Sequence, residues 1–345
     1  MRYPPGLVFD SARHIVARKL RGEHRFAVTL SLRPLGSACK RATAGEAAPS
    51  AGQEGEALSV AECLAAVDEC GAPVISVCGR EPLDYPKIPE LTRAILNRGK
   101  HLVLCTDGTQ ISRRLHMIPP ETRFFWNVSL DGTQSVHDAR AGRPGQFLEA
   151  LDGIKAAKNA GFFVLITTTI HPETNVRDVA ALFATLHAMH VDGYLFSPVY
   201  PEAKLCRVGC AMFHEKLQQR FREASEALDG YNLLNAPAYL EYLRGERELD
   251  CCAWGNPAYG PEGWSRPCSV LNCGHEESYR KLLEKTSWEN FGRGMNPRCE
   301  TCSRPEGFET AAILGMNPKA GDVWKMLAWQ FSGSLGERRN GMRKP

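Results

Sequence analysis

The sequence predicts an α/β fold: a partial barrel of six parallel strands with crossover helices outside it, followed by a small C-terminal domain that contains cysteines. Between residues 58 and 200, apolar runs of four to eight residues alternate with amphipathic segments. This alternation is typical of buried parallel strands that are joined by helices. After Pro201 it stops, and a loop-rich region with six cysteines follows at 250–310.

Each element follows from its own pattern. A basic amphipathic helix is expected at 7–22, and strand Phe26–Leu32 follows it. Ser59 with Glu62 is the signature of a capping box, so a helix should begin there and run to about Cys70. The other strands are predicted at Pro73–Val77, His101–Cys105, Phe124–Leu130, Phe162–Ile170 and Gly193–Ser197. The other helices are predicted at Ile88–Asn97, 109–116, Gln146–Ala160, Val176–Met189, 213–228 and Val323–Phe331.

These elements divide the chain into four expected parts. They are an N-terminal amphipathic helix at 1–25, the barrel at 26–205, a C-terminal domain with the cysteine cluster at 206–315, and a basic tail at 316–345.

Composition and charge argue against several classes of protein. The net charge of +3 is too small to indicate a nucleic-acid partner. The sequence contains no run of eighteen apolar residues, so it predicts no membrane span. The first residues carry charges and prolines where a secretory signal needs an apolar core. We therefore expect a cytoplasmic protein whose thirteen cysteines are reduced thiols, some of them candidate metal ligands.

Positive charge collects at the two ends, in 13–21 and 338–344. Either segment could be a solvated helix face or a peripheral contact with anionic lipid, and the solvated face is the simpler interpretation.

In parallel α/β barrels, functional groups lie where strands end and loops begin. The site is therefore expected among the residues that follow the six strands. These residues are Cys39, 78–82, 105–108, 129–132, 167–169 and 197–200.

The order of these segments, together with 58–73, 254–257, 263–268 and the CxxC of Cys299 and Cys302, resembles radical SAM enzymes. Among them, the chain is most similar to the hopanoid-associated family, adenosylhopane synthase. The resemblance implies a radical-SAM-type barrel, S-adenosylmethionine as cofactor and a hydrophobic, hopanoid-like lipid or small molecule as substrate. It places the cofactor beside Gly79, Glu81, Pro82, Asp131, Thr169, Val199 and Tyr200, and it makes Cys105 the hydrogen donor that quenches a substrate radical.

The chain departs from the family at the cluster loop. The family holds a [4Fe–4S] cluster with three cysteines in a CxxxCxxC pattern after strand one. Here Ala38, Ala42 and Gly45 stand at those positions, and Cys39 is one residue out of register. Iron–sulfur clusters need thiolate ligands, so the standard N-terminal cluster is predicted to be absent. The family's Gly-Gly-Glu-Pro also carries Arg80 in place of its second glycine.

The remaining thiols leave alternatives open. Cys105 is either the donor that the family implies or a small buried apolar residue. Cys39, Cys78 and Cys105 lie at the ends of neighbouring predicted strands and could bind a cluster or zinc. The simpler explanation is that the three thiols lie near one another by coincidence.

Cys268, Cys299 and Cys302 could hold zinc or an auxiliary iron–sulfur cluster, with Cys252 or Cys273 as a fourth ligand. The alternative is a set of buried thiols, since Glu306 stands where the family has a further cysteine.

Three functions follow. The first is a non-radical homologue that serves as a partner or scaffold for an intact radical SAM enzyme. The second is an active radical SAM enzyme that forms a carbon–carbon bond with relocated cluster ligands. The third is a zinc-stabilised binding protein.

Overall fold

The computed structural model describes residues 2–36, 57–200, 210–315 and 319–339. The predicted cluster positions Ala38, Ala42 and Gly45, together with Cys39, lie outside the described residues.

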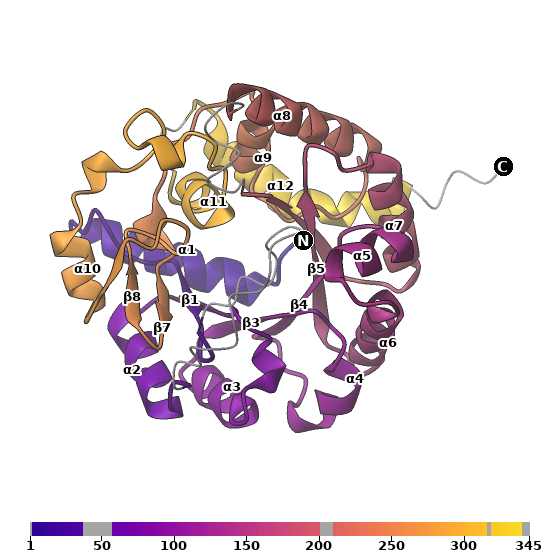
Figure 1. Ribbon diagram of the computed structural model, residues 1–345, viewed down its shortest axis with the longest axis horizontal. Coiled ribbons are helices and arrows are strands. Elements are labelled where there is room, and N and C mark those ends of the chain that lie inside the picture. The colour runs from indigo at the N-terminus through magenta and orange to yellow at the C-terminus, as the bar shows by residue number, and fades with distance from the viewer. Residues whose placement is uncertain (1, 37–56, 201–209, 316–318, 340–345) are drawn as a thin grey trace.

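Six parallel strands form the predicted partial barrel, in the order β6-β5-β4-β3-β2-β1 (Figure 1). Their bounds are β1 Thr29–Leu32, β2 Val74–Val77, β3 His101–Thr106, β4 Phe124–Ser129, β5 Phe163–Ile170 and β6 Gly193–Pro198. Each strand pairs in parallel with its neighbour, as Leu30 does with Ile75. The α/β prediction is therefore confirmed.

Helices cover the outer face of this sheet (Figure 1). They are α2 Val60–Cys70, α3 Ile88–Asn97, α4 Ile111–Arg114, α5 Gln134–Ala141, α6 Gln146–Asn159 and α7 Val176–Ala188. Ser59 caps α2 in the predicted capping box, and Gly71 ends this helix with a left-handed backbone. The helix expected at 109–116 is instead α4 followed by a 3-10 turn, η2 Leu115–Met117.

Three short strands that the sequence did not indicate extend the same sheet beyond β1. They are β7 Ala258–Gly260, β8 Gly263–Arg266 and β9 Gly274–Glu276. β7 pairs in parallel with β1, whereas β7 with β8 and β8 with β9 are antiparallel. The cysteine-containing region is thus continuous with the barrel sheet, and the domain boundaries given above remain predictions.

Helices and 3-10 turns make up the rest of the C-terminal region. The helices are α8 Cys210–Ala227, α9 Pro237–Leu243, α10 Tyr279–Lys285, α11 Pro305–Leu314 and α12 Asp322–Arg339. The 3-10 turns are η4 Ala253–Gly255, η5 Trp288–Asn290 and η6 Pro297–Cys299, and a further one in the barrel is η1 Pro82–Asp84.

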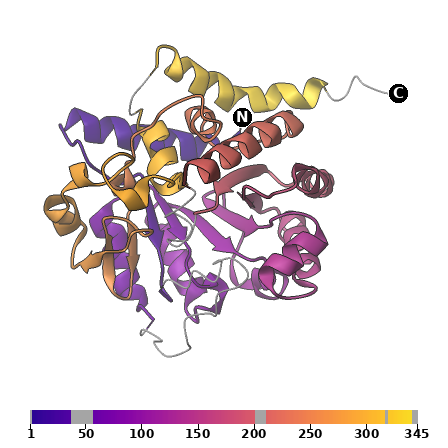
Figure 2. The ribbon, with the colours of Figure 1, turned by 45° about the horizontal axis from the view of Figure 1, so that its top comes forward.

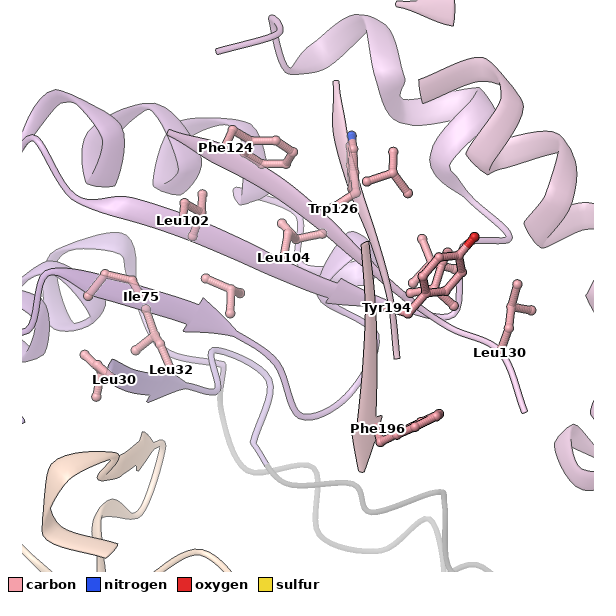
Figure 3. Packing of buried hydrophobic residues seen from close by; sticks show 14 of the residues in the cluster. Leu30, Leu32, Ile75, Leu102, Leu104, Phe124, Trp126, Leu130, Tyr194 and Phe196 are labelled. Atoms are coloured by element: carbon pink, nitrogen blue, oxygen red, sulfur yellow. The ribbon is translucent and has the colours of Figure 1, made fainter. Parts of the chain in front are cut away.

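The main core lies between the sheet and its outer helices, and Figure 3 shows part of it. Successive strand residues point to opposite faces, so every second residue of each strand enters this layer. Leu30, Ile75, Leu104 and Trp126 belong to it and are fully buried. The strands therefore place their other residues on the inner face of the barrel.

The N-terminal helix α1, Pro5–Leu20, closes the barrel at the end where the strands begin. Tyr3 and Leu7 pack there against Phe125, Leu165 and their neighbours on the inner face. Asp10 of α1 also accepts a hydrogen bond, at 3.0 Å, from the buried ring of His101 at the start of β3. With this end closed, the inner face is reachable from the opposite end, where the strands finish.

In the described part of the chain, no helix is long and apolar enough to cross a membrane.

Candidate functional site at the mouth of the barrel

Polar side chains surround Cys105 on the inner face of the barrel. They lie closer to the ends of the strands than the apolar contacts of Tyr3 and Leu7 do. Ser76 of β2 lies 3.4 Å from the Cys105 sulfur, and the Asn127 amide donates to that sulfur at 3.6 Å. Thr167 of β5 in turn donates to the Asn127 carbonyl at 2.7 Å. Cys105 is half-buried, so it faces the interior of the barrel and is not part of the core. This position suits a group that meets a bound ligand, and the role of Cys105 remains a prediction.

Ser76 and Asn127 were not singled out from the sequence, whereas Thr167 lies within the predicted segment 167–169. A signal for the first two was present, because each is a polar residue within a mostly apolar strand. The period of two along a strand would have placed both on the face that carries Cys105.

Glu81 is fixed by the fold at the ends of β2 and β3. Its carboxylate accepts from the Thr106 hydroxyl at 2.8 Å, from the Asp107 amide at 3.0 Å and from the Leu83 amide at 3.1 Å. Burial raises the pKa of Glu81, while the Asp107 amide opposes that rise. Pro82 begins the 3-10 turn that follows. Through these hydrogen bonds, Glu81 joins the end of β2 to the end of β3.

Gly79 makes the close backbone approach in this loop. Its φ is +97°, and a Cβ there would stand 2.5 Å from the Gly36 carbonyl oxygen. The neighbouring Arg80 is exposed.

At the end of β4, Asp131 accepts from the Thr169 amide at 2.8 Å, which ties the end of β4 to that of β5. The buried His137 ring lies 3.4 Å from the Asp131 amide. Asp138 points away and accepts from the amides of Gly145 and Phe147 at the start of α6. His137 and Asp138 therefore make separate contacts, one with the end of β4 and the other with the start of α6.

The residues after β6 connect the mouth with the C-terminal region. Val199 donates to the Ile170 carbonyl at 3.0 Å, and the Tyr200 hydroxyl donates to the Arg298 carbonyl at 2.8 Å. The structure thus brings the predicted residues Gly79, Glu81, Asp131, Thr169 and Val199 to one end of the barrel.

Four C-terminal thiols line one cavity of about 60 Å³: Cys251, Cys268, Cys299 and Cys302. Burial raises the pKa of Cys302 to about 12, and it also raises the pKa values of the other three. Gly307 leaves room for the Cys251 sulfur, which a Cβ at that position would strike. No disulfide joins these four cysteines.

Neither residue proposed as a fourth ligand reaches this cavity. Cys252 packs against Phe26 and Trp254 on the other side of the backbone, and the exposed Cys273 receives a hydrogen bond from Arg298. The fourth thiol at the cavity is Cys251. Within the described ranges, no three His, Cys, Asp or Glu side chains stand close enough to hold a metal ion.

Glu306, where the resemblance expected a further cysteine, forms an ion pair with Arg304 at 2.7 Å. Burial alone would raise the pKa of Glu306, but the Arg304 charge and hydrogen bond lower it. The ion pair with Arg304 thus keeps the Glu306 side chain in its charged form.

Comparison with known proteins identifies two units in the chain. Residues 39–186 match the sequence model of the radical SAM superfamily. This chain contains a radical SAM domain. Residues 196–326 match a domain of unknown function, DUF3463, so the superfamily domain is followed by a second recognised unit.

Curated relatives are similar to part of this chain. An Fe-coproporphyrin III synthase of Methanosarcina barkeri is 31% identical over 176 residues, which is 50% of this chain and 42% of the relative. An AdoMet-dependent heme synthase of the same organism is 25% identical over 210 residues, 59% of each protein. The chain spans about half the length of these relatives.

Solved radical SAM structures share the fold. Streptococcus suis SuiB superposes with a TM-score of 0.60 at 15% identity, and the match covers 86% of this chain and 75% of SuiB. A histidine-tagged anSMEcpe with bound AdoMet gives a TM-score of 0.55 at 15% identity, with 91% of this chain and 98% of that chain covered. At this identity the likeness shows the fold alone.

These relatives overturn one expectation. The resemblance to the hopanoid family, adenosylhopane synthase, is wrong, since the relatives that match half of this chain or more are coproporphyrin and heme synthases. The stretches that suggested it are largely demanded by the shared fold. Residues 58–73, for example, form a capped helix that leads into β2, and Asp131 ties two strand ends together.

Proposed function

We propose that this radical SAM protein does not cleave S-adenosylmethionine reductively, and that it acts as a non-radical homologue or as a partner subunit of an intact radical SAM enzyme. One observation carries the proposal. Between β1 and α2, residues 33–59 contain a single cysteine, Cys39. Three thiolates are needed to anchor a [4Fe–4S] cluster that leaves one iron open, and alanine and glycine supply none. The side chains of residues 33–59 therefore do not fit a [4Fe–4S] cluster.

A relocated cluster has little support. Cys78 and Cys105 are the described thiols nearest to the mouth, and Cys105 already contacts Ser76 and Asn127. No third described ligand accompanies them, because the described residues include no set of three metal-binding side chains.

The mouth nevertheless keeps groups that suit a nucleoside. One oxygen of Asp131 accepts from Thr169, and its carboxylate has a second oxygen for a ligand hydroxyl. For the remaining ligand we propose a hydrophobic small molecule. The names of the relatives support a tetrapyrrole as the first compound to titrate.

We expect the reduced protein, incubated anaerobically with S-adenosylmethionine and dithionite, to release no 5′-deoxyadenosine above the buffer rate. Calorimetric titration should still detect binding of the intact cofactor. Asp131→Ala should weaken that binding by roughly tenfold or more, because a hydrogen bond to a charged group contributes about 1.5–3 kcal/mol. Steady release of 5′-deoxyadenosine would contradict the proposal, whereas unchanged binding by the Asp131→Ala variant would contradict only the role of Asp131.

The cavity lined by four thiols favours a second candidate, a zinc-stabilised binding protein. Because the side chains do not converge on one point, zinc would require them to turn inward and lose their protons. If zinc binds there, protein purified without added iron should contain about one zinc per chain. A chelator should then lower its Tm, and Cys302→Ser should abolish both effects while Cys273→Ser leaves them unchanged. Protein without zinc, and with an unaltered Tm, would eliminate this candidate.

A further inference from the structure

The exposed apolar side chains of this protein gather on two helices. Among the described residues, eleven large hydrophobic side chains are exposed, and seven of them belong to α1 and α12. Those on α1 are Phe9, Val16 and Leu20, and those on α12 are Val323, Trp324, Leu327 and Phe331. Leu20 is 84% exposed and Trp324 is 76% exposed, so neither packs against the rest of the chain.

Each set forms a stripe along its helix. On α1 the three residues are separated by seven and four positions, and on α12 Val323, Leu327 and Phe331 are four apart. Such spacings keep side chains on one face of a helix. These two sets of side chains are here called the α1 and α12 faces.

The two helices lie at the same end of the molecule, with α12 outermost (Figure 2). Residues just before α1 hold them together. The Arg2 amide donates to the Gln330 carbonyl at 2.9 Å, and the Arg2 guanidinium stands 5.7 Å from the centre of the Trp329 ring. Arg247 binds Asp322 at the start of α12 at 2.7 Å, so α12 is anchored at both ends of its described apolar stretch.

The charge around the α1 face is mostly positive. Arg13, Lys19, Arg21 and Arg25 are exposed on α1 and the turn after it. The carboxylates in the same segment are paired: Asp10 contacts His101 and Arg13, and Glu23 pairs with Arg18. On α12 the exposed Lys325 pairs with Glu241, so the flanking cations belong to α1.

We propose that the α1 and α12 faces bind the surface of an anionic phospholipid bilayer. An apolar helix face flanked by cations, beside a second apolar helix face, suits the boundary between headgroups and acyl chains, where apolar side chains enter and cations meet phosphates. A protein partner of matching shape would need acidic groups to meet these cations. The binding end is opposite to the barrel mouth, so the inference is independent of the proposed function.

The test is flotation of the full chain with vesicles of phosphatidylcholine alone and of phosphatidylcholine mixed with phosphatidylglycerol. We expect binding to the mixed vesicles, weakened by salt and much weaker on phosphatidylcholine alone. The pair Arg13→Ser with Arg21→Ser should reduce it by about tenfold or more. Trp324→Ser with Leu327→Ser should reduce it similarly. The matched control is Leu148→Ser with Arg177→Ser, an exposed apolar residue and an exposed cation on the barrel wall, which should bind as the wild type does.

Circular dichroism should show an unchanged fold in all three variants, since every substituted residue is exposed. Failure to bind mixed vesicles, or equal binding by all variants, would overturn the proposal. Reversible self-association without lipid that the α12 variant abolishes would also overturn it, because the faces would then cover a second copy of the chain.

Discussion

Trp264→Ala is expected to lower the free energy of unfolding by about 3–5 kcal/mol, the range for deleting a fully buried large aromatic side chain. Trp264 lies on β8 and is fully buried between the rings of Tyr259 and Tyr279. Its indole donates to Glu69 of α2 at 3.2 Å, and the second oxygen of Glu69 accepts from the Tyr279 amide at 2.8 Å. Removing the indole therefore leaves a cavity between the barrel and the C-terminal strands.

Denaturant titration measures this effect, with Trp324→Ala as the control. Trp324 is 76% exposed, so its loss should change the free energy of unfolding by less than about 0.5 kcal/mol. Because β7 extends the barrel sheet, the Trp264 variant should still unfold in one transition. If a C-terminal transition instead separates from that of the barrel, the two parts are energetically independent and the continuity of the sheet does not couple them.

Glu309→Gln is expected to stabilise the protein at alkaline pH by about 1–3 kcal/mol, because the folded protein then has no buried carboxylate at this position. Burial raises the pKa of Glu309 to about 7, although the Ala236 amide opposes that rise with a hydrogen bond at 2.9 Å. The folded state thus binds a proton more tightly than the unfolded state does. Stability should fall as pH rises from the ordinary glutamate range of about 4.5 through 7.

Unfolding titrations between pH 4 and pH 9 would show this slope as the difference between the wild type and Glu309→Gln. Glutamine keeps one oxygen for the Ala236 amide and has no charge to bury. Glu289 is exposed, so Glu289→Gln should retain the wild-type slope and serves as the control. An identical pH dependence in the Glu309 variant would show that this carboxyl group is not titrating near neutrality.

The sequence predicted the barrel well because each parallel strand is buried on its outer face and reads as an apolar run. Helix Ile88–Asn97 agrees with the structure at both ends, and the capping box fixed the start of α2. The strands β7 to β9 escaped notice because three or four residues are too few to show a period. Their position depends on pairing with β1, which is a long-range contact that no local pattern encodes.

The site was predicted in outline. The ends of parallel strands meet at one edge of a sheet, so Glu81, Asp131 and Thr169 could be placed together from topology alone. Their hydrogen bonds could not be foreseen, and these show Glu81 holding strand ends rather than standing free. The choice of Cys251 over Cys252 at the thiol cavity depends on which side of the backbone each residue faces. Irregular chain gives no period from which to read that.

The proposed function depends on the missing thiolates, and anaerobic reconstitution with iron and sulfide tests them most directly. The wild-type protein should retain no [4Fe–4S] absorption and almost no iron after desalting. The matched variant, Ala38→Cys with Ala42→Cys and Gly45→Cys, restores the CxxxCxxC spacing and should gain about four irons per chain. About four irons and that absorption in the wild type would contradict the proposal.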